Sequence, residues 1–202
     1  MRRVYFLVVF LFLIFGAMAS EEVRLRDLTR AMRELTSYRV TFEMAVNGER
    51  MDFVGGYIVV GDRYQLTMPG QVILGDSLVR YTIDDNNGEV VVERVDPSSV
   101  PMVISNPARA FTVLDQAFAA SLKFTGSEYY TLWLRPKMGD PIVRVAELQI
   151  SHKSHLPMSI AYTSHEGDRV EVTLDITQDS TLVIQPLDST LYPSGYEVID
   201  FR

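Results

Sequence analysis

The stretch GDSL at residues 75–78 holds the residue whose type is best suited to covalent chemistry, because one class of serine esterases carries its nucleophile in this block. The Ser77 hydroxyl would need a base to take its proton and a third group to orient that base. The available bases are His152, His155 and His165, and none has an aspartate three positions before it, the spacing that these esterases use. The residues after Ser77 also lack a helical stripe. The sequence therefore favours a turn between strands, and the esterase stays a distant alternative.

Two other groups of polar residues have types that could bind a metal or cleave a glycoside. The histidines of the HKSH turn at residues 152–155 and His165 have no acidic residue at ligand spacing. The acids of the 84–93 region have nothing that fixes their separation, which a glycosidase pair needs. Both groups are predicted to be solvated turns, with no metal site.

The first twenty residues, MRRVYFLVVFLFLIFGAMAS, have the pattern of a secretory signal peptide. A basic start precedes the apolar run of residues 4–15, and small residues follow at Ala17 and Ala19. The run is shorter than the roughly 20 residues of a spanning helix. We expect cleavage after Ala19, export to the periplasm, and a single domain over residues 20–202. An uncleaved anchor is the alternative.

Charge and cysteine content exclude several classes of protein. The formal net charge is −7, and removing Arg2 and Arg3 makes it −9, so nucleic acid is not expected as a partner. The chain has no cysteine, which excludes disulfides, thiolate chemistry and lipidation at the cleavage site.

The elements that must position any site are predicted from hydrophobic periodicity. Residues 21–38 have the apolar stripe of an amphipathic helix, and the period then changes to two, which indicates strands. Three prolines interrupt the strands over residues 96–122, where Asn106-Pro107 begins a short Ala-rich helix whose apolar face includes Phe118. The expected strands cover residues 40–46, 51–59, 63–68, 78–83, 89–95, 129–134, 143–150, 157–163 and 169–176, followed by a tail at 192–202.

This order of elements predicts an α+β fold that is mainly antiparallel β. The sheet is expected to be a curved, incomplete (open) β-barrel, with the N-terminal helix and the central helical insertion covering its concave face. A gap between the two layers would form an apolar cavity.

Several strings, in this order, resemble the LolA family of outer-membrane lipoprotein carriers, and the closing string resembles the branch found in Bacteroidota. They are SYRVTF at 37–42, GDRY at 61–64, GDSLVRY at 75–81, NP at 106–107, LPMSI at 156–160 and the residues from Tyr192-Pro193 to EVIDFR at 197–202. At the GDSL position, relatives have a turn before an aromatic strand.

The resemblance implies a monomeric periplasmic chaperone that is not an enzyme and needs no cofactor. Its cavity would hold the acyl chains of lipoproteins, taken from an inner-membrane lipoprotein-releasing transporter and passed to an outer-membrane acceptor. The alternative on the same fold is a lipid- or glycolipid-binding protein or an envelope-stress sensor. The residues expected to line the acyl cavity are Phe42, Met44, Phe53, Tyr57, Phe111, Leu114, Phe118 and Met158.

One position departs from the family pattern. Well-studied relatives have an Arg-Pro pair on an early strand, and the arginine holds the helical lid shut. Here that pair falls on Val60 and Gly61. Two alternatives follow from this departure. Either apolar contacts alone hold the lid, or the protein carries a different cargo.

Overall fold

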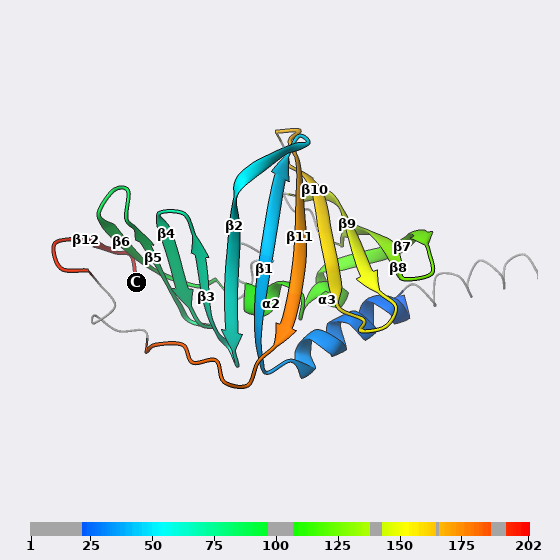
Figure 1. Cartoon of the computed structure of the whole chain (residues 1–202), viewed down its shortest axis with the longest axis horizontal. Coiled ribbons are helices and arrows are strands. Elements are labelled where there is room, and N and C mark those ends of the chain that lie inside the picture. The colour runs from blue at the N-terminus through cyan, green and yellow to red at the C-terminus, as the bar shows by residue number, and fades with distance from the viewer. Residues whose placement is uncertain (1–21, 97–106, 138–142, 165, 187–192) are drawn as a thin grey trace, which may run out of the picture.

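The structure is a computed structural model that describes residues 22–96, 107–137, 143–164, 166–186 and 193–202. Its strands form one 12-stranded sheet in the order β12-β6-β5-β4-β3-β2-β1-β11-β10-β9-β8-β7 (Figure 1). The signal-peptide prediction, Asn106 and His165 lie outside the described residues.

The strands divide into two consecutive runs. The first run is β1 (Ser37–Val46), β2 (Glu49–Val60), β3 (Arg63–Met68), β4 (Gln71–Gly75), β5 (Val79–Asp84) and β6 (Glu89–Arg94). The second is β7 (Phe118–Thr125), β8 (Tyr129–Pro136), β9 (Val143–Ser151), β10 (Pro157–Ser164) and β11 (Arg169–Gln178), followed by β12 (Glu197–Asp200). The prediction missed β4, and it placed the beginning of β7 in a helix.

A central seam joins the two runs. β1 pairs with β11 antiparallel, with Val40 opposite Ile176, although the two residues are far apart in the chain. β7 and β12 form the two edges of the sheet, so the sheet does not close into a barrel. Neighbouring strands are antiparallel except β12, which pairs with β6 in parallel. The predicted open, mainly antiparallel sheet is confirmed.

Three helices accompany the sheet in the described part of the chain. The N-terminal helix covers residues 22–34 and ends before the predicted residue 38. The insertion contains α2 (Pro107–Ala110) and α3 (Leu114–Ala117). The prediction that Phe118 belongs to a helix is wrong, because Phe118 begins β7 and lies opposite Pro136 of β8. Strand pairing over residues 118–125 outweighs the helical preference of the alanines there.

The sheet supports two hydrophobic clusters, one on each face. The inner cluster lies between the sheet and the helices and includes Leu28, Val40, Tyr57, Phe111 and Leu148. The outer cluster consists of Leu74, Tyr81, Ile83, Val90, Val92 and Ile184. Ile184 comes from the segment that follows β11.

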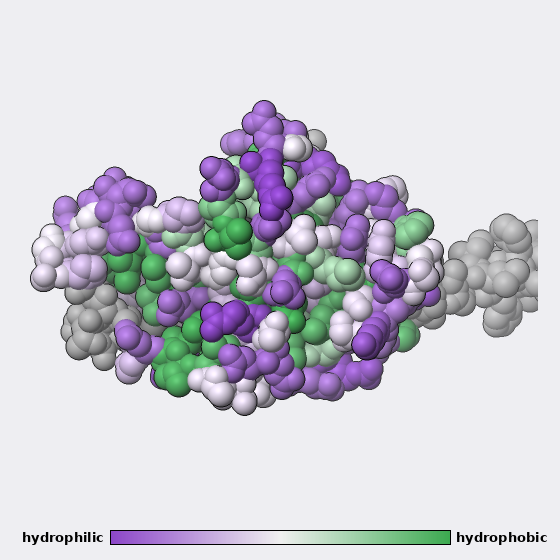
Figure 2. All heavy atoms as spheres, in the orientation of Figure 1, coloured by the Kyte–Doolittle hydropathy of each residue, from purple (hydrophilic) through white to green (hydrophobic). Residues whose placement is uncertain are grey.

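The side of the molecule seen in Figure 2 has a mixed surface. Hydrophilic residues cover the projecting ends of β1, β2, β10 and β11, and hydrophobic residues reach the surface in separate patches elsewhere. Within the described ranges, no helix has the length and apolar composition needed to cross a membrane.

Candidate functional site

The helices cover the inner face mainly through apolar side chains. In the N-terminal helix, Leu25, Leu28 and Met32 are each at most 2% exposed and belong to the inner cluster. In the insertion, Phe111 and Leu114 belong to the same cluster. Since the N-terminal helix makes these contacts through side chains, it can separate from the sheet without breaking the backbone ladder of the sheet. α3 is tied more closely, because it runs directly into β7 and its Ala117 carbonyl accepts a 2.9 Å hydrogen bond from the Lys137 backbone N–H.

A cavity of about 290 Å³ lies where the end of the N-terminal helix meets α2, the α2–α3 turn and the sheet. Its apolar side chains come from the helix, the sheet and the insertion. The lining residues are Met32, Arg33, Leu35, Tyr38, Val59, Gly61, Ala108, Thr112 and Val113. This cavity marks the joint between the two helical covers.

Arg33 fastens this joint. Its Nε and Nη2 donate hydrogen bonds of 2.9 and 2.6 Å to the backbone carbonyl of Thr112, in the turn between α2 and α3. Nη2 also lies 3.5 Å from the Asp115 carboxylate. The cover is therefore not held by apolar contacts alone. The family's arginine position, Val60, packs instead against the outer cluster, on the face away from the helices.

The predicted lining residues lie around the inner cluster but do not line this cavity. Phe42, Tyr57, Phe111, Leu114 and Phe118 are buried in the cluster, and Met44 and Phe53 pack against it partly buried. Met158 is 39% exposed. Most of the predicted lining residues therefore pack with the helical side chains in this structure.

Two tyrosine hydroxyls in this region are buried without a hydrogen-bond partner among the described residues, those of Tyr57 and Tyr130. Burial, and secondarily the neighbouring Tyr38, raises the pKa of Tyr57 well above its ordinary value. Burial raises the pKa of Tyr130 to about 12, although the Arg24 guanidinium, 5.1 Å from the ring centre, opposes the shift. Both hydroxyls therefore stay neutral at physiological pH.

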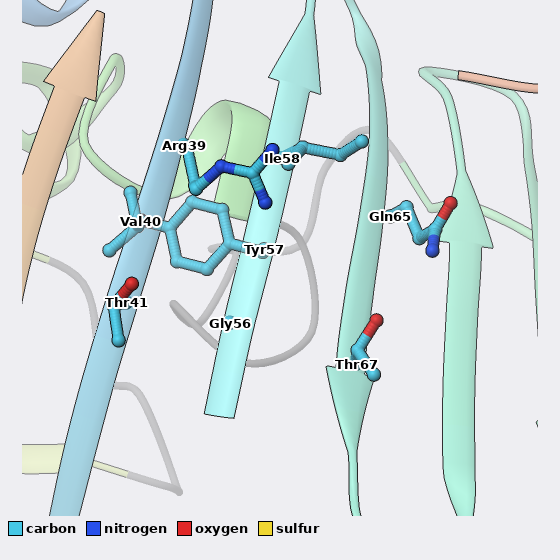
Figure 3. A pocket seen from close by; sticks show the side chains of 8 residues that line it. All are labelled: Arg39, Val40, Thr41, Gly56, Tyr57, Ile58, Gln65 and Thr67. Carbon is cyan, nitrogen blue, oxygen red and sulfur yellow. The ribbon is translucent and has the colours of Figure 1, made fainter. Parts of the chain in front are cut away.

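A second depression, of about 310 Å³, lies on the outer face of β1, β2 and β3 (Figure 3). Arg39, Thr41, Gln65 and Thr67 give it a polar rim, and α2 lies behind the sheet in this view. Gly56 also lines it. A Cβ atom at this position would lie 3.3 Å from the Val40 carbonyl oxygen. No described helix covers this depression.

Ser77 is a turn residue between β4 and β5. The Asp76 carboxylate accepts hydrogen bonds from the backbone N–H groups of Leu78 and Val79 at 2.7 and 2.9 Å, and the Ser77 hydroxyl lies 3.3 Å from the Asp62 carboxylate. The two described histidines lie in the β9–β10 turn, and β9 is six strands from β4 in the sheet order. The described residues therefore provide Ser77 with no base, and they contain no group of three or more acidic or histidine side chains that could hold a metal ion.

No protein-family model matches the chain. No curated protein matches it either. Among solved structures, an uncharacterized conserved protein from Thermus thermophilus is similar with a TM-score of 0.57 and 8% identity, over 87% of this chain and 98% of the other.

Two further solved structures match with lower scores. They are a putative outer-membrane lipoprotein-sorting protein domain from Vibrio parahaemolyticus and a LolA superfamily protein from Nitrosomonas europaea. The first has a TM-score of 0.46 and 12% identity, over 82% of this chain and 95% of the other. The second has a TM-score of 0.40 and 11% identity, over 83% and 96%.

The chain is a protein of the open-sheet, helix-covered class. The Thermus likeness, at 8% identity, is a likeness of fold alone.

Proposed function

We propose that the protein binds the acyl chains of lipoproteins between the helices and the inner face of the sheet and carries them through the periplasm. The observation that carries the proposal is the cavity of about 290 Å³ at the joint of the two helical covers, with side chains from both covers and from the sheet. An inner-membrane lipoprotein-releasing transporter would supply the cargo, and an outer-membrane acceptor would receive it. The role needs no catalytic residue, metal or cofactor.

The cavity opens to solvent and is too small for a complete ligand while the helices stay in place, since ligand pockets range from about 300 to 1,000 Å³. Binding therefore requires the helices to move outward. Each buried methylene contributes ~0.8 kcal/mol, so a chain of about 16 carbons could supply on the order of 12 kcal/mol. Displacing Leu28, Phe111 and their neighbours offsets part of that gain. This opposition would let a carrier release its cargo.

The first experiment fastens the joint chemically. The chain has no cysteine, so Arg33→Cys with Thr112→Cys can be linked selectively by a bifunctional maleimide that contains a reducible disulfide. We expect the linked protein not to take up a fluorescent acyl chain and the reduced protein to regain uptake. The control pair, Arg26→Cys with Arg30→Cys, lies within one helix and should bind equally in both states. Equal uptake by the linked and reduced joint pair would contradict binding beneath the helices.

The second experiment tests carriage in the native host. Depletion of the protein should leave outer-membrane lipoproteins in the inner membrane, measured by membrane fractionation. Normal sorting together with acyl binding in vitro would restrict the function to lipid binding or sensing.

A further inference from the structure

The buried hydroxyl of Tyr57 indicates more about the ligand than its apolar chains. A buried polar group without a partner costs about 1–3 kcal/mol, and such groups are rare in native proteins. Tyr57 is 2% exposed, and its hydroxyl has no hydrogen-bond partner among the described residues. A phenylalanine of the same shape would avoid this cost.

Tyr57 borders the outer depression and does not line the cavity itself, but its side chain packs in the inner cluster against a residue that lines the cavity. Its ring packs edge-on against Tyr38, with ring centres 6.4 Å apart and an interplanar angle of 76°. On another side, its ring centre is 6.5 Å from that of Phe42. Tyr38 itself lines the cavity. The outward movement of the helices that a full acyl chain requires would therefore enlarge the space next to Tyr57.

The surroundings of Tyr57 restrict the kind of acceptor that could approach it. The buried polar residues in the described part of the chain are Thr29 and Thr131, and neither carries a charge. The cation that lines the cavity, Arg33, is half exposed and already donates to the Thr112 carbonyl, so a carboxylate at the Tyr57 hydroxyl would have no buried cation to compensate it, which is costly. A neutral acceptor is suited to this environment, and the neutral acceptor nearest to an acyl chain is the carbonyl oxygen of its ester or amide bond.

We propose that the Tyr57 hydroxyl donates a hydrogen bond to the carbonyl oxygen of an ester- or amide-linked acyl chain when the helices open. The protein then selects acyl groups over hydrocarbon chains that lack a carbonyl and over free fatty-acid anions. This inference rests on the proposed acyl-binding function. In the closed state the unpaired hydroxyl destabilises the closed form, and the ligand removes that cost.

Tyr130, the other unpaired tyrosine, has different surroundings. Its ring lies under Arg24 and has its centre 5.1 Å from the centre of the His152 ring. Neither tyrosine lines the cavity itself, but the Tyr57 ring packs against Tyr38, which does. Tyr57 is therefore the hydroxyl that we assign to the ligand.

The test compares two lipids that differ only in their carbonyl groups. Dipalmitoyl phosphatidylglycerol has ester carbonyls, and dihexadecyl phosphatidylglycerol has the same chains and headgroup joined by ethers. Each is titrated against the fluorescence of bound anilinonaphthalene sulfonate. For Tyr57→Phe we expect about 3- to 10-fold weaker binding of the ester lipid, the value of one net hydrogen bond, and unchanged binding of the ether lipid. The ligand-free variant should melt about 2–4 °C higher.

The matched control is Tyr64→Phe, on the neighbouring strand β3. Tyr64 is fully buried, but its hydroxyl lies against Gly75, where an added Cβ would come within 2.5 Å of it. This control should leave the ratio of ester to ether affinity unchanged.

Three results would overturn the inference. Tyr57→Phe could weaken the binding of both lipids equally, or it could leave the binding of the ester lipid unchanged. The ligand-free variant could also melt at a lower temperature than the wild type, which would show that the hydroxyl has a hydrogen-bond partner in the closed state. If the wild type binds neither lipid, the proposed acyl-binding function fails, and the inference fails with it.

Discussion

The two hydrophobic clusters of this sheet are covered in different ways. The inner cluster is covered by helices that attach mainly through apolar side chains and the Arg33 hydrogen bonds, with Lys137 donating to the Asp115 and Ala117 carbonyls of α3. The outer cluster is covered by the segment containing Ile184, and the chain then returns to the sheet as β12. There the backbone N–H groups of Glu197 and Phe201 donate to the Gly88 and Val92 carbonyls at 2.9 and 2.8 Å.

The difference separates a removable cover from a permanent one. Side-chain contacts can break and re-form as a unit while each helix keeps its internal hydrogen bonds. A paired strand leaves only when its ladder breaks, which exposes backbone groups of the partner strand. We therefore expect changes to the inner cover to alter ligand binding, and changes to the outer cover to alter only stability.

The largest effect should come from Leu28→Asp in the N-terminal helix. Leu28 is fully buried, so a carboxylate at this position should destabilise the docked helix by at least about 4 kcal/mol. We expect the helix to leave the sheet, with a several-fold rise in anilinonaphthalene sulfonate fluorescence and a preserved β signal in circular dichroism. Arg26→Ala, on the exposed side of the helix, should change neither signal. If the β signal disappears when the helix leaves, the helix and the sheet fold as one unit.

The outer cover is tested by Ile184→Ala. Ile184 is 6% exposed, and truncating it should lower the free energy of unfolding by about 2–4 kcal/mol, measured in urea. Lipid affinity should remain at the wild-type value. Val183→Ala is the control, because the neighbouring Val183 is 82% exposed and should tolerate the change. A changed lipid affinity in Ile184→Ala would contradict the expectation that the outer cover affects only stability.

A smaller effect is expected for Arg33→Ala. The variant loses two hydrogen bonds between the helical segments, which at this half-exposed position contribute about 1 kcal/mol. Because the closed form weakens, lipid should bind about 3- to 10-fold more tightly, and amides of the N-terminal helix should exchange faster with deuterium. Arg30→Ala removes only an ion pair within the helix, to Asp27, and should have neither effect. Weaker lipid binding by Arg33→Ala would show that Arg33 contacts the ligand instead of holding the helices closed.

The smallest effect concerns Glu147, on the outer face of β9. Burial opposes its ionisation, but hydrogen bonds from Lys123 and Trp133 outweigh burial and hold its pKa below the ordinary value. A carboxyl group with a lowered folded-state pKa stabilises the fold above its unfolded pKa of about 4.3 and loses this contribution as the pH falls through the folded value.

Glu147→Gln should therefore flatten the decline in the free energy of unfolding between pH 5 and the acid limit of folding, by less than about 1 kcal/mol. The free energy is measured by urea titration at each pH. Ligand binding at neutral pH should not change. An unaltered acid profile would show that the Glu147 network adds nothing to stability.

Most strands were predicted from the sequence, but β4 was missed. In this strand both faces of the sheet are covered by hydrophobic clusters. β1 alternates between Val40 and Phe42 inside and Arg39 and Thr41 outside, which is the pattern of a strand with one covered face. In β4, Ile73 belongs to the inner cluster and the next residue, Leu74, to the outer cluster. Alternation disappears where both faces are covered, so the β4 stretch QVILG gave no period-two signal.

The site was less predictable than the sheet. Arg33 lies on the polar side of an amphipathic helix, where an arginine is ordinary, and its acceptor is 79 residues away in the chain. Nothing local distinguishes it from Arg30. The alanines at 119 and 120 favoured a helix, and only pairing with β8 makes them part of a strand. Most residues predicted to line the cavity belong to the inner cluster or pack against it, and how closely the covering helices pack on them depends on tertiary packing.

The seam between β1 and β11 has a consequence for how the chain reaches its native state. Its partners extend from Tyr38 with Gln178 to Val46 with Val170, so more than half of the chain separates the two strands. A polypeptide that emerges from the ribosome or from a membrane pore in order of its sequence must wait for β11 before β1 gains its second neighbour. Closing so long a loop slows assembly. A chaperone that shields β1 during this interval would therefore raise the yield of folded protein more than one acting on any later strand.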